Sequence, residues 1–210
     1  MRKTRTDPEV RRQQILEAAT HMIGLQGYNG LTVHDLARKC GLTNGGLLYY
    51  FGSKEQLLIA ILEERDRNTA AIIHADLEIE RAKSGQADFT RRTVVHTFRA
   101  IITRCVAQPE FLRFHIVLKA EALNPEHPAH GFFLRREEFV LSEFAKLLTG
   151  HVDNPERRAL QIFALLEGIQ HQWLRTDMAF DLLAEFGAAI ELVLPWAAEF
   201  LKSDEIYATA

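Results

Sequence analysis

Three candidate helix starts follow one another closely in the first quarter of the sequence, at Thr32, Thr43 and Ser53. Hydroxyl side chains at such positions accept hydrogen bonds from the free backbone N–H groups of a helix's first turn. Asp35, three positions after Thr32, completes a capping box, and Gly41 lies where a glycine commonly follows a helix. This segment therefore predicts two short helices joined by a tight turn, followed by the start of a third helix.

The two short helices are predicted over about 33–40 and 44–50, after an amphipathic helix over about 9–26 that ends at Gly27. Two short helices around a glycine turn form the helix-turn-helix unit, whose second helix can enter the major groove of DNA.

The second of these helices begins with Thr43, Asn44, Gly45 and Gly46, which are small or polar enough to approach base edges. Asn44 can pair with the major-groove edge of adenine. Each glycine lowers helix propensity by roughly 1 kcal/mol relative to alanine, so two in one short helix need a reason. Close approach of the backbone to DNA is one explanation, and relief of a tight crossing between helices is the other.

The stretch from about residue 11 to residue 62 resembles, in one ungapped register, the DNA-binding domain of the TetR family of transcriptional regulators. The residues that carry the resemblance are Ile15, Ala18, Ala19, Gly27, Thr32, Val33, Leu36, Ala37, Gly41, Leu42, Gly45, Leu47, Tyr50, Phe51, Ser53, Lys54, Glu55 and Leu57. The chain departs from the family at Leu48, where many members have a tyrosine that meets a phosphate. Which of the next two rings makes which contact is therefore open.

The resemblance also implies DNA contacts outside the start of the second helix. Thr32, Tyr50 and Lys54 would bind phosphate groups, and His34 and Tyr49 would face the groove. Lys54 is expected in the first turn of a helix, where the amide dipoles favour phosphate. Alternatively, Tyr49 and Tyr50 are core rings.

Charge is unevenly distributed along the chain. The formal net charge is −3, but residues 1–54 contain eight Lys/Arg and four Asp/Glu, a net charge of +4. The remainder contains 17 basic and 24 acidic residues, a net charge of −7. A basic segment on an acidic body indicates a local phosphate-binding surface. Arg2, Lys3 and Arg5 form either a solvated tail or an arm that touches DNA.

Helical periodicity continues along the chain, and the sequence predicts an all-α fold of about nine helices. The later helices are predicted over about 54–82, 88–107, 109–123, 129–149, 155–176 and 179–202. We expect a helix-turn-helix domain over 9–62, with its motif at about 32–51, and a larger ligand-binding and dimerisation domain over 63–203.

Composition and motifs argue against several other protein classes. No run of 18 apolar residues occurs, so no membrane span is expected. Two cysteines, Cys40 and Cys105, are too few for a disulfide framework, which fits a cytoplasmic protein. No HExxH, CxxC or GxSxG motif is present, so we expect no cofactor or metal, and an enzyme is the less favoured alternative.

Aromatic residues are frequent in the second domain, and polar residues lie among them. A largely apolar cavity with a few polar groups is typical of a small-molecule site. The family resemblance implies that such a cavity binds an inducer, and ordinary core packing is the alternative for each candidate. The candidate ligand contacts are Phe98, Phe114, Phe139, Phe163, Gln170 and Trp173.

The helices predicted over 155–176 and 179–202 are apolar around most of their circumference, so each needs a second partner. Two such helices from each of two subunits would form a four-helix bundle, although burial within one subunit is the alternative. Pro195 should kink the last helix or start a new turn. The candidate interface residues are Leu160, Gly168, Ala188, Ala189, Leu192 and Trp196.

The sequence thus predicts a transcriptional regulator that binds a palindromic operator in double-stranded DNA as a homodimer. We expect a repressor that a small apolar effector releases from DNA. A ligand-independent architectural protein or activator with the same DNA-binding domain is the main alternative, and ligand-induced loss of DNA binding would distinguish the two.

Overall fold

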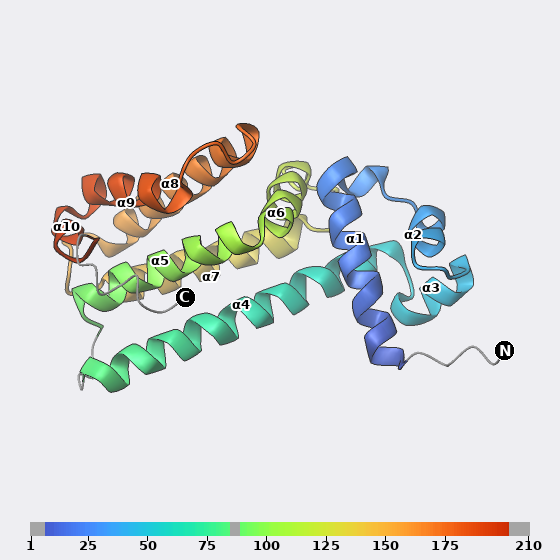
Figure 1. Ribbon diagram of the computed structural model, residues 1–210, viewed down its shortest axis with the longest axis horizontal. Helices are drawn as coiled ribbons and strands as arrows, with labels where there is room; N and C mark the ends of the chain where they lie inside the picture. Colours follow the sequence, from blue (N-terminus) through green and yellow to red (C-terminus); the bar gives the residue numbers. More distant parts are fainter. Residues whose placement is uncertain (1–6, 85–88, 202–210) are drawn as a thin grey trace. The chain divides into compact units, whose positions relative to one another are not determined.

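The computed structural model describes residues 7–84 and 89–201, and every regular element in these two ranges is a helix (Figure 1). The all-α fold class predicted from the sequence is therefore confirmed. None of the helices described is long and apolar enough to cross a membrane. The elements in chain order are α1 (Pro8–Gly30), α2 (Val33–Lys39), α3 (Asn44–Phe51), α4 (Lys54–Ser84), α5 (Arg91–Ala107), α6 (Pro109–Glu121), α7 (His130–Leu148), α8 (Pro155–Arg175), α9 (Leu182–Val193), the 3-10 turn η1 (Pro195–Ala197) and α10 (Ala198–Leu201).

The chain divides into two compact units. The first unit contains residues up to Asn68 together with Pro109–Leu134, and the second contains Thr69–Gln108 and the residues from Arg135 onward. The first unit therefore combines α1, α2, α3 and the start of α4 with α6, which comes much later in the sequence.

The three predicted helix starts are confirmed by their hydrogen bonds. The hydroxyl oxygens of Thr32, Thr43 and Ser53 each accept a hydrogen bond from the backbone N–H three residues later, at 3.0, 3.0 and 3.1 Å. The Asp35 carboxylate accepts the hydroxyl proton of Thr32 at 2.7 Å, which orients the cap that opens α2. The two short helices of the helix-turn-helix unit are thus defined locally, by capping residues around a glycine turn.

The first helix contains a break that determines where α2 begins. Gly27 has φ 75° and ψ 170°, a conformation that residues with a Cβ rarely adopt. The helix continues for one more turn to Gly30, which the sequence did not predict. The N–H of Leu31 donates to the Tyr28 carbonyl at 3.1 Å and closes this turn, and α2 follows directly.

The core of the first unit collects apolar side chains from all of its helices. Leu47 and Phe51 attach α3 to this core, and Phe114 and Leu118 attach α6, which lies against α1 (Figure 1). The other buried members of the core are Ile15, Leu16, Ala19, Ile23, Tyr28, Leu31, Leu36, Ala37, Leu57, Leu58, Ile61, Leu62, Ala122, Ala129 and Phe133.

The core of the second unit is built around aromatic rings. Phe98 on α5 packs edge-to-face on Phe144 of α7, with ring centroids 4.9 Å apart, and lies 6.4 Å from the ring of Phe186 on α9. Phe163 on α8 lies 6.4 Å from Phe144. The helices α8 and α9 pack against each other, and α9 also packs against α5.

The last predicted helix, over 179–202, is wrong as a single element. Asp181 accepts hydrogen bonds from two backbone N–H groups, at 2.9 and 3.0 Å, so α9 begins only at Leu182. The helix ends at Val193, and Pro195 opens the 3-10 turn, as its ring and missing N–H group dictate. The predicted effect of Pro195 is confirmed.

Candidate nucleic-acid interface

The helix α3 has one buried and one exposed face. Leu47 and Phe51, one helical turn apart, are 0% and 7% exposed and hold the helix to the core of the first unit. Asn44, Gly45 and Tyr49 are exposed, and the Tyr49 ring is 86% accessible. An anchored helix with a polar and aromatic outer face has the arrangement that a groove-reading helix requires.

The two glycines of α3 do not relieve a tight helix crossing. A Cβ added to Gly45 would meet no atom within 4 Å, so the space above this position is open. A Cβ on Gly46 would meet the capping hydroxyl of Thr43 at 3.2 Å, which belongs to the same short segment. Without side chains at these two positions, the backbone at the start of α3 is accessible from outside. Of the two explanations for the glycines, this favours close approach of a partner over relief of a tight helix crossing.

The two adjacent tyrosines of α3 have different surroundings. Tyr50 is half-buried and packs against the core of the first unit, whereas Tyr49 projects into solvent. Their rings meet edge-to-face with centroids 5.7 Å apart. The alternative that both tyrosines are core residues is therefore partly correct for Tyr50, which is half-buried, and wrong for Tyr49, which is exposed. Leu48, where many family members have a tyrosine, is half-buried against the core.

The helix α2 contributes further exposed polar residues. Thr32 and His34 are exposed at its start, although the Thr32 hydroxyl is already engaged in the cap. Arg38 and Lys39 are exposed at its end, and Arg38 also pairs with Asp35 at 2.9 Å. These two cations were not among the predicted contacts. The only sequence signal for them was the positive charge of the N-terminal segment.

Lys54, the first residue of α4, is half-buried against Tyr28. Its ammonium lies 4.0 Å from the centre of the Tyr28 ring, a cation–π contact. Burial lowers the pKa of Lys54, and the carboxylates of Glu55 and Glu121 act in the opposite direction. Burial and the Glu55 carboxylate raise the pKa of Tyr28 to about 12, and the Tyr28 hydroxyl donates to Glu55 at 3.4 Å. The structure thus places Lys54 at the edge of the helix-turn-helix unit, packed on Tyr28.

The six predicted ligand contacts are not brought together. Phe98, Phe163, Gln170 and Trp173 are buried in the second unit. The polar atoms of the last two have protein partners: Gln170 donates to the sulfur of Cys105 at 3.1 Å, and the indole N–H of Trp173 donates to a backbone carbonyl at 3.0 Å.

The other two predicted ligand contacts lie elsewhere. Phe114 is fully buried in the core of the first unit, and Phe139 is 59% exposed on α7.

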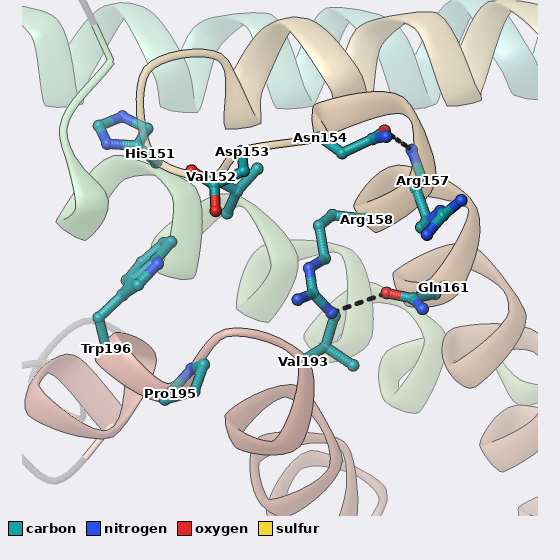
Figure 2. Close-up of a pocket in the computed structure, with 10 residues that line it drawn as sticks. All are labelled: His151, Val152, Asp153, Asn154, Arg157, Arg158, Gln161, Val193, Pro195 and Trp196. Atoms are coloured by element: carbon teal, nitrogen blue, oxygen red, sulfur yellow. Dashed lines mark hydrogen bonds between the residues drawn. The ribbon is translucent and has the colours of Figure 1, made fainter.

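The second unit has an open cavity of about 400 Å³ at the start of α8 (Figure 2). Arg158 donates to Gln161 at 2.9 Å, and His151 bonds the Phe89 carbonyl at 2.7 Å. This lining combines charged and polar side chains with apolar ones, and it contains none of the six predicted ligand contacts. The cavity is lined by His151, Val152, Asp153, Asn154, Arg157, Arg158, Gln161, Val193, Pro195 and Trp196.

The predicted interface residues include two large exposed apolar side chains. Leu160 on α8 is 55% exposed and Leu192 on α9 is 82% exposed, although the two helices already pack together. Gly168 and Ala188 are also exposed. The remaining two, Ala189 and Trp196, are half-buried, and Trp196 lies under the guanidinium of Arg91 at 5.2 Å.

Within residues 7–84 and 89–201, no group of three His, Cys, Asp or Glu side chains is placed to hold a metal ion. The chemistry available to the exposed face of α3 is hydrogen bonding, aromatic contact and close backbone approach. This fold and this surface define a helix-turn-helix protein whose second helix is available to DNA.

Comparison with known proteins agrees with this class. Residues 15–61 match the model of the bacterial regulatory proteins of the tetR family. The helix-turn-helix region of the chain is thus similar to the DNA-binding domain of TetR-family transcriptional regulators.

Individual relatives extend the similarity beyond the matched domain. The transcriptional regulator SrpR of Pseudomonas putida is 36% identical over 81 residues, which is 39% of this chain and 38% of SrpR. The transcriptional repressor KstR2 of Mycolicibacterium smegmatis is 24% identical over 87% of this chain and 77% of its own length. A TetR-family regulator structure from Agrobacterium tumefaciens has the same fold, with a TM-score of 0.69 and 19% identity over 90% of this chain and 98% of that one.

The chain spans only 38% to 60% of the length of four curated relatives that are 30% to 39% identical to it. The activity and the partners of the whole protein are therefore proposals.

Proposed function

We propose that this protein is a transcriptional repressor that binds a palindromic operator in double-stranded DNA. The observation that carries the proposal is the two-sided character of α3. Leu47 and Phe51 fix the helix to a core, while Asn44, Gly45 and Tyr49 face outward. Asn44 would read a base edge, and the low surface over Gly45 would let the helix backbone approach the groove floor. Repression, rather than activation, is supported by the similarity to KstR2, which is a transcriptional repressor.

The remaining DNA contacts are assigned to the edges of the helix-turn-helix unit. Thr32, His34, Thr43, Gly46 and Tyr50 lie on its exposed or half-buried surface. Lys54 stands at the start of α4, where free backbone N–H groups favour a phosphate. Phosphate contacts of this kind would set the register of the helix on the duplex, while Asn44 carries the base preference.

The second part of the proposal is a homodimer formed through α8 and α9. Leu160 and Leu192 are large apolar side chains that the chain itself leaves exposed. The small residues Gly168 and Ala188 are exposed on the same helices and allow close approach of a partner helix. A two-fold dimer presents two reading helices, so the operator half-sites should be centred about 34–36 Å apart or a multiple of this distance.

The third part is an effector, a small and largely apolar molecule that binds the second unit. The aromatic core around Phe98 and Phe163, with the amide of Gln170 and the indole of Trp173, supplies the apolar surroundings with a few polar groups that such a site needs. We propose these four residues as the contacts. The effector must favour the arrangement that does not bind DNA, because only differential affinity shifts an equilibrium.

The experiment that tests the proposed function is selection of bound duplexes from random DNA by the full chain. The expected result is a near-palindrome with two half-sites. Recovery of no consensus would reject the proposal. If a consensus is found but no apolar compound from a thermal-shift screen weakens its binding, a ligand-independent regulator is the better description. The protein is expected to act in the cytoplasm, where the operator is found.

A further inference from the structure

One side chain from α6 closes the break in α1. At Gly27 the helix leaves its regular conformation, so the N–H of Tyr28 needs a partner outside the helix ladder. The carboxylate of Glu121, the last residue of α6, accepts this N–H at 2.7 Å. Tyr28 itself is 5% exposed. A hydrogen bond from a backbone N–H to a charged acceptor in such surroundings is among the stronger ones in proteins.

The break is shaped to receive that carboxylate. A Cβ on Gly27 would collide with the Oε1 atom of Glu121, and the φ of 75° would also disfavour any residue with a side chain. The side chain of Glu121 is only 25% exposed. His127, 4% exposed in its side chain, lies with Nε2 3.9 Å from the same carboxylate. Because Nδ1 of His127 accepts the N–H of Ala129 at 3.2 Å, the ring proton lies on Nε2, toward Glu121.

Tyr28 connects this bond to both ends of the helix-turn-helix unit. On one side, the turn from Tyr28 to Leu31 leads directly into the cap of α2. On the other side, the Tyr28 hydroxyl donates to Glu55, and the ammonium of Lys54 lies over the Tyr28 ring. Lys54 and Glu55 are the first two residues of α4. The helices α2 and α3 lie between these two points in the sequence. The position of Tyr28 therefore affects both the entry to the unit and its exit.

We propose that Glu121 is a positioning residue for DNA binding: it holds Tyr28, and through Tyr28 it sets the orientation of α2 and α3 in the first unit. The inference rests on the proposed DNA-binding function. It assigns a role in that function to a residue that is far along the sequence from the reading helix and is not itself expected to touch DNA.

The test compares three variants of the full chain on the duplex that the wild-type chain selects from random DNA. Glu121→Met keeps the length of the side chain but cannot accept the Tyr28 N–H, and Glu121→Gln keeps an acceptor oxygen. Glu110→Ala is the matched control, because Glu110 is also a carboxylate of α6 that contacts α1, through His21 at 3.1 Å, but it lies away from the break. Affinity is measured by fluorescence anisotropy at a temperature at which circular dichroism shows every variant to be folded.

The Met variant is expected to lose about tenfold in affinity for the selected duplex. It should also bind the selected duplex and a scrambled one with more similar affinities, and the Tyr28 amide should exchange its hydrogen faster. The Gln variant should recover most of the affinity, and the Glu110 variant should stay within about twofold of the wild type. A purely structural role would lower the unfolding temperature without changing the affinity of the folded protein or its preference between the two duplexes.

The inference is overturned if the Met and Gln variants bind the selected duplex as tightly as the wild type while Tyr28 exchange is faster in the Met variant. If the Met variant does not fold, Glu121→Ala, which also removes the acceptor of the Tyr28 N–H, takes its place with the same expected loss, and wild-type affinity in that variant overturns the inference. A tenfold loss in the Glu110 control alone would also contradict the assignment. A wild-type chain that selects no sequence would instead reject the proposed function, and the inference with it.

Discussion

The backbone nitrogen of Phe114 on α6 lies 3.3 Å from the point that a Cβ on Gly24 of α1 would occupy. The two helices therefore approach each other so closely that only a glycine fits at this position without adjustment. The contact is between backbones, so neither partner can move aside by changing a side-chain rotamer.

Replacement of Gly24 by valine should consequently destabilise the protein. We expect a loss of about 1–3 kcal/mol in the free energy of unfolding, as in other overpacked cores. Leu25→Val is the matched control, since it introduces the same residue at the neighbouring position, where the native side chain is 68% exposed. Urea denaturation measures both, and equal losses in the two variants would show that α1 and α6 are not in tight contact.

Gly45→Ala should separate stability from DNA binding. The added methyl group meets no protein atom within 4 Å, and alanine favours the helix by roughly 1 kcal/mol over glycine. The variant should therefore unfold at a higher temperature but bind its operator less tightly, because the methyl group stands on the face that approaches DNA. A variant that is more stable and binds DNA as well as the wild type would remove Gly45 from the interface.

Variants at Asn44 and Lys54 should lose DNA binding in different ways. Asn44→Ala is expected to relax the preference at one base pair in each half-site, at a cost of about 1–3 kcal/mol. Lys54→Ala should weaken binding to all sequences and reduce the dependence on salt concentration. Competition binding against single-base operator variants at several salt concentrations distinguishes the two. The assignment fails if the Asn44 variant keeps full discrimination while the Lys54 variant loses it.

Leu192→Lys should convert the proposed dimer into monomers, because it places a charge in a surface that the partner would desolvate. Leu123→Lys is the control: Leu123 is 80% exposed, similar to the 82% of Leu192, but it lies in the turn after α6 rather than on α8 or α9. Light scattering gives the mass of each variant. A wild-type mass for the Leu192 variant would place the interface elsewhere, and a monomeric wild type would reject the dimer.

The buried His127 should make stability depend on pH. Burial lowers the pKa of His127 in the folded protein, Glu121 raises it and Lys54 lowers it. The folded protein therefore resists protonation more than the unfolded chain does, so stability falls as the pH decreases below about 6.5 and continues to fall until the folded-state pKa is passed. Urea unfolding at about pH 7.5 and about pH 5 should show a smaller difference for His127→Gln than for the wild type. If the stability of the two proteins changes equally between these pH values, the pH dependence arises from groups other than His127.

Much of the helix-turn-helix unit could be predicted because its determinants are local. Thr32, Thr43 and Ser53 each cap a helix through a backbone N–H only three residues away, so the sequence contains the whole interaction. The same holds for Pro195, whose ring ends α9 wherever the rest of the chain lies.

Other features depend on pairs of residues that are distant in the sequence, and no local pattern indicates them. Glu121 bonds the N–H of Tyr28 across 93 positions, and Phe114 meets Gly24 only because α6 folds back onto α1. The sequence alone therefore does not distinguish Phe114, a core residue of the first unit, from a residue that lines a ligand pocket. Similarly, an aromatic residue on a helix predicts burial but not its partner, and Phe139, a predicted ligand contact, is exposed in the structure.

The presence of α6 in the first unit has a consequence for protein engineering. A chimera that joins residues 9–62 of this chain to the body of another regulator would leave behind Phe114 and Leu118, which complete the core, and Glu121, which closes the break in α1. In the transplanted segment, the apolar face of α1 that α6 covers would be exposed, and the Tyr28 N–H would lose its partner. Exchange of DNA specificity between regulators of this architecture therefore requires two separate pieces of sequence to be moved together, or substitutions confined to the outer face of α3.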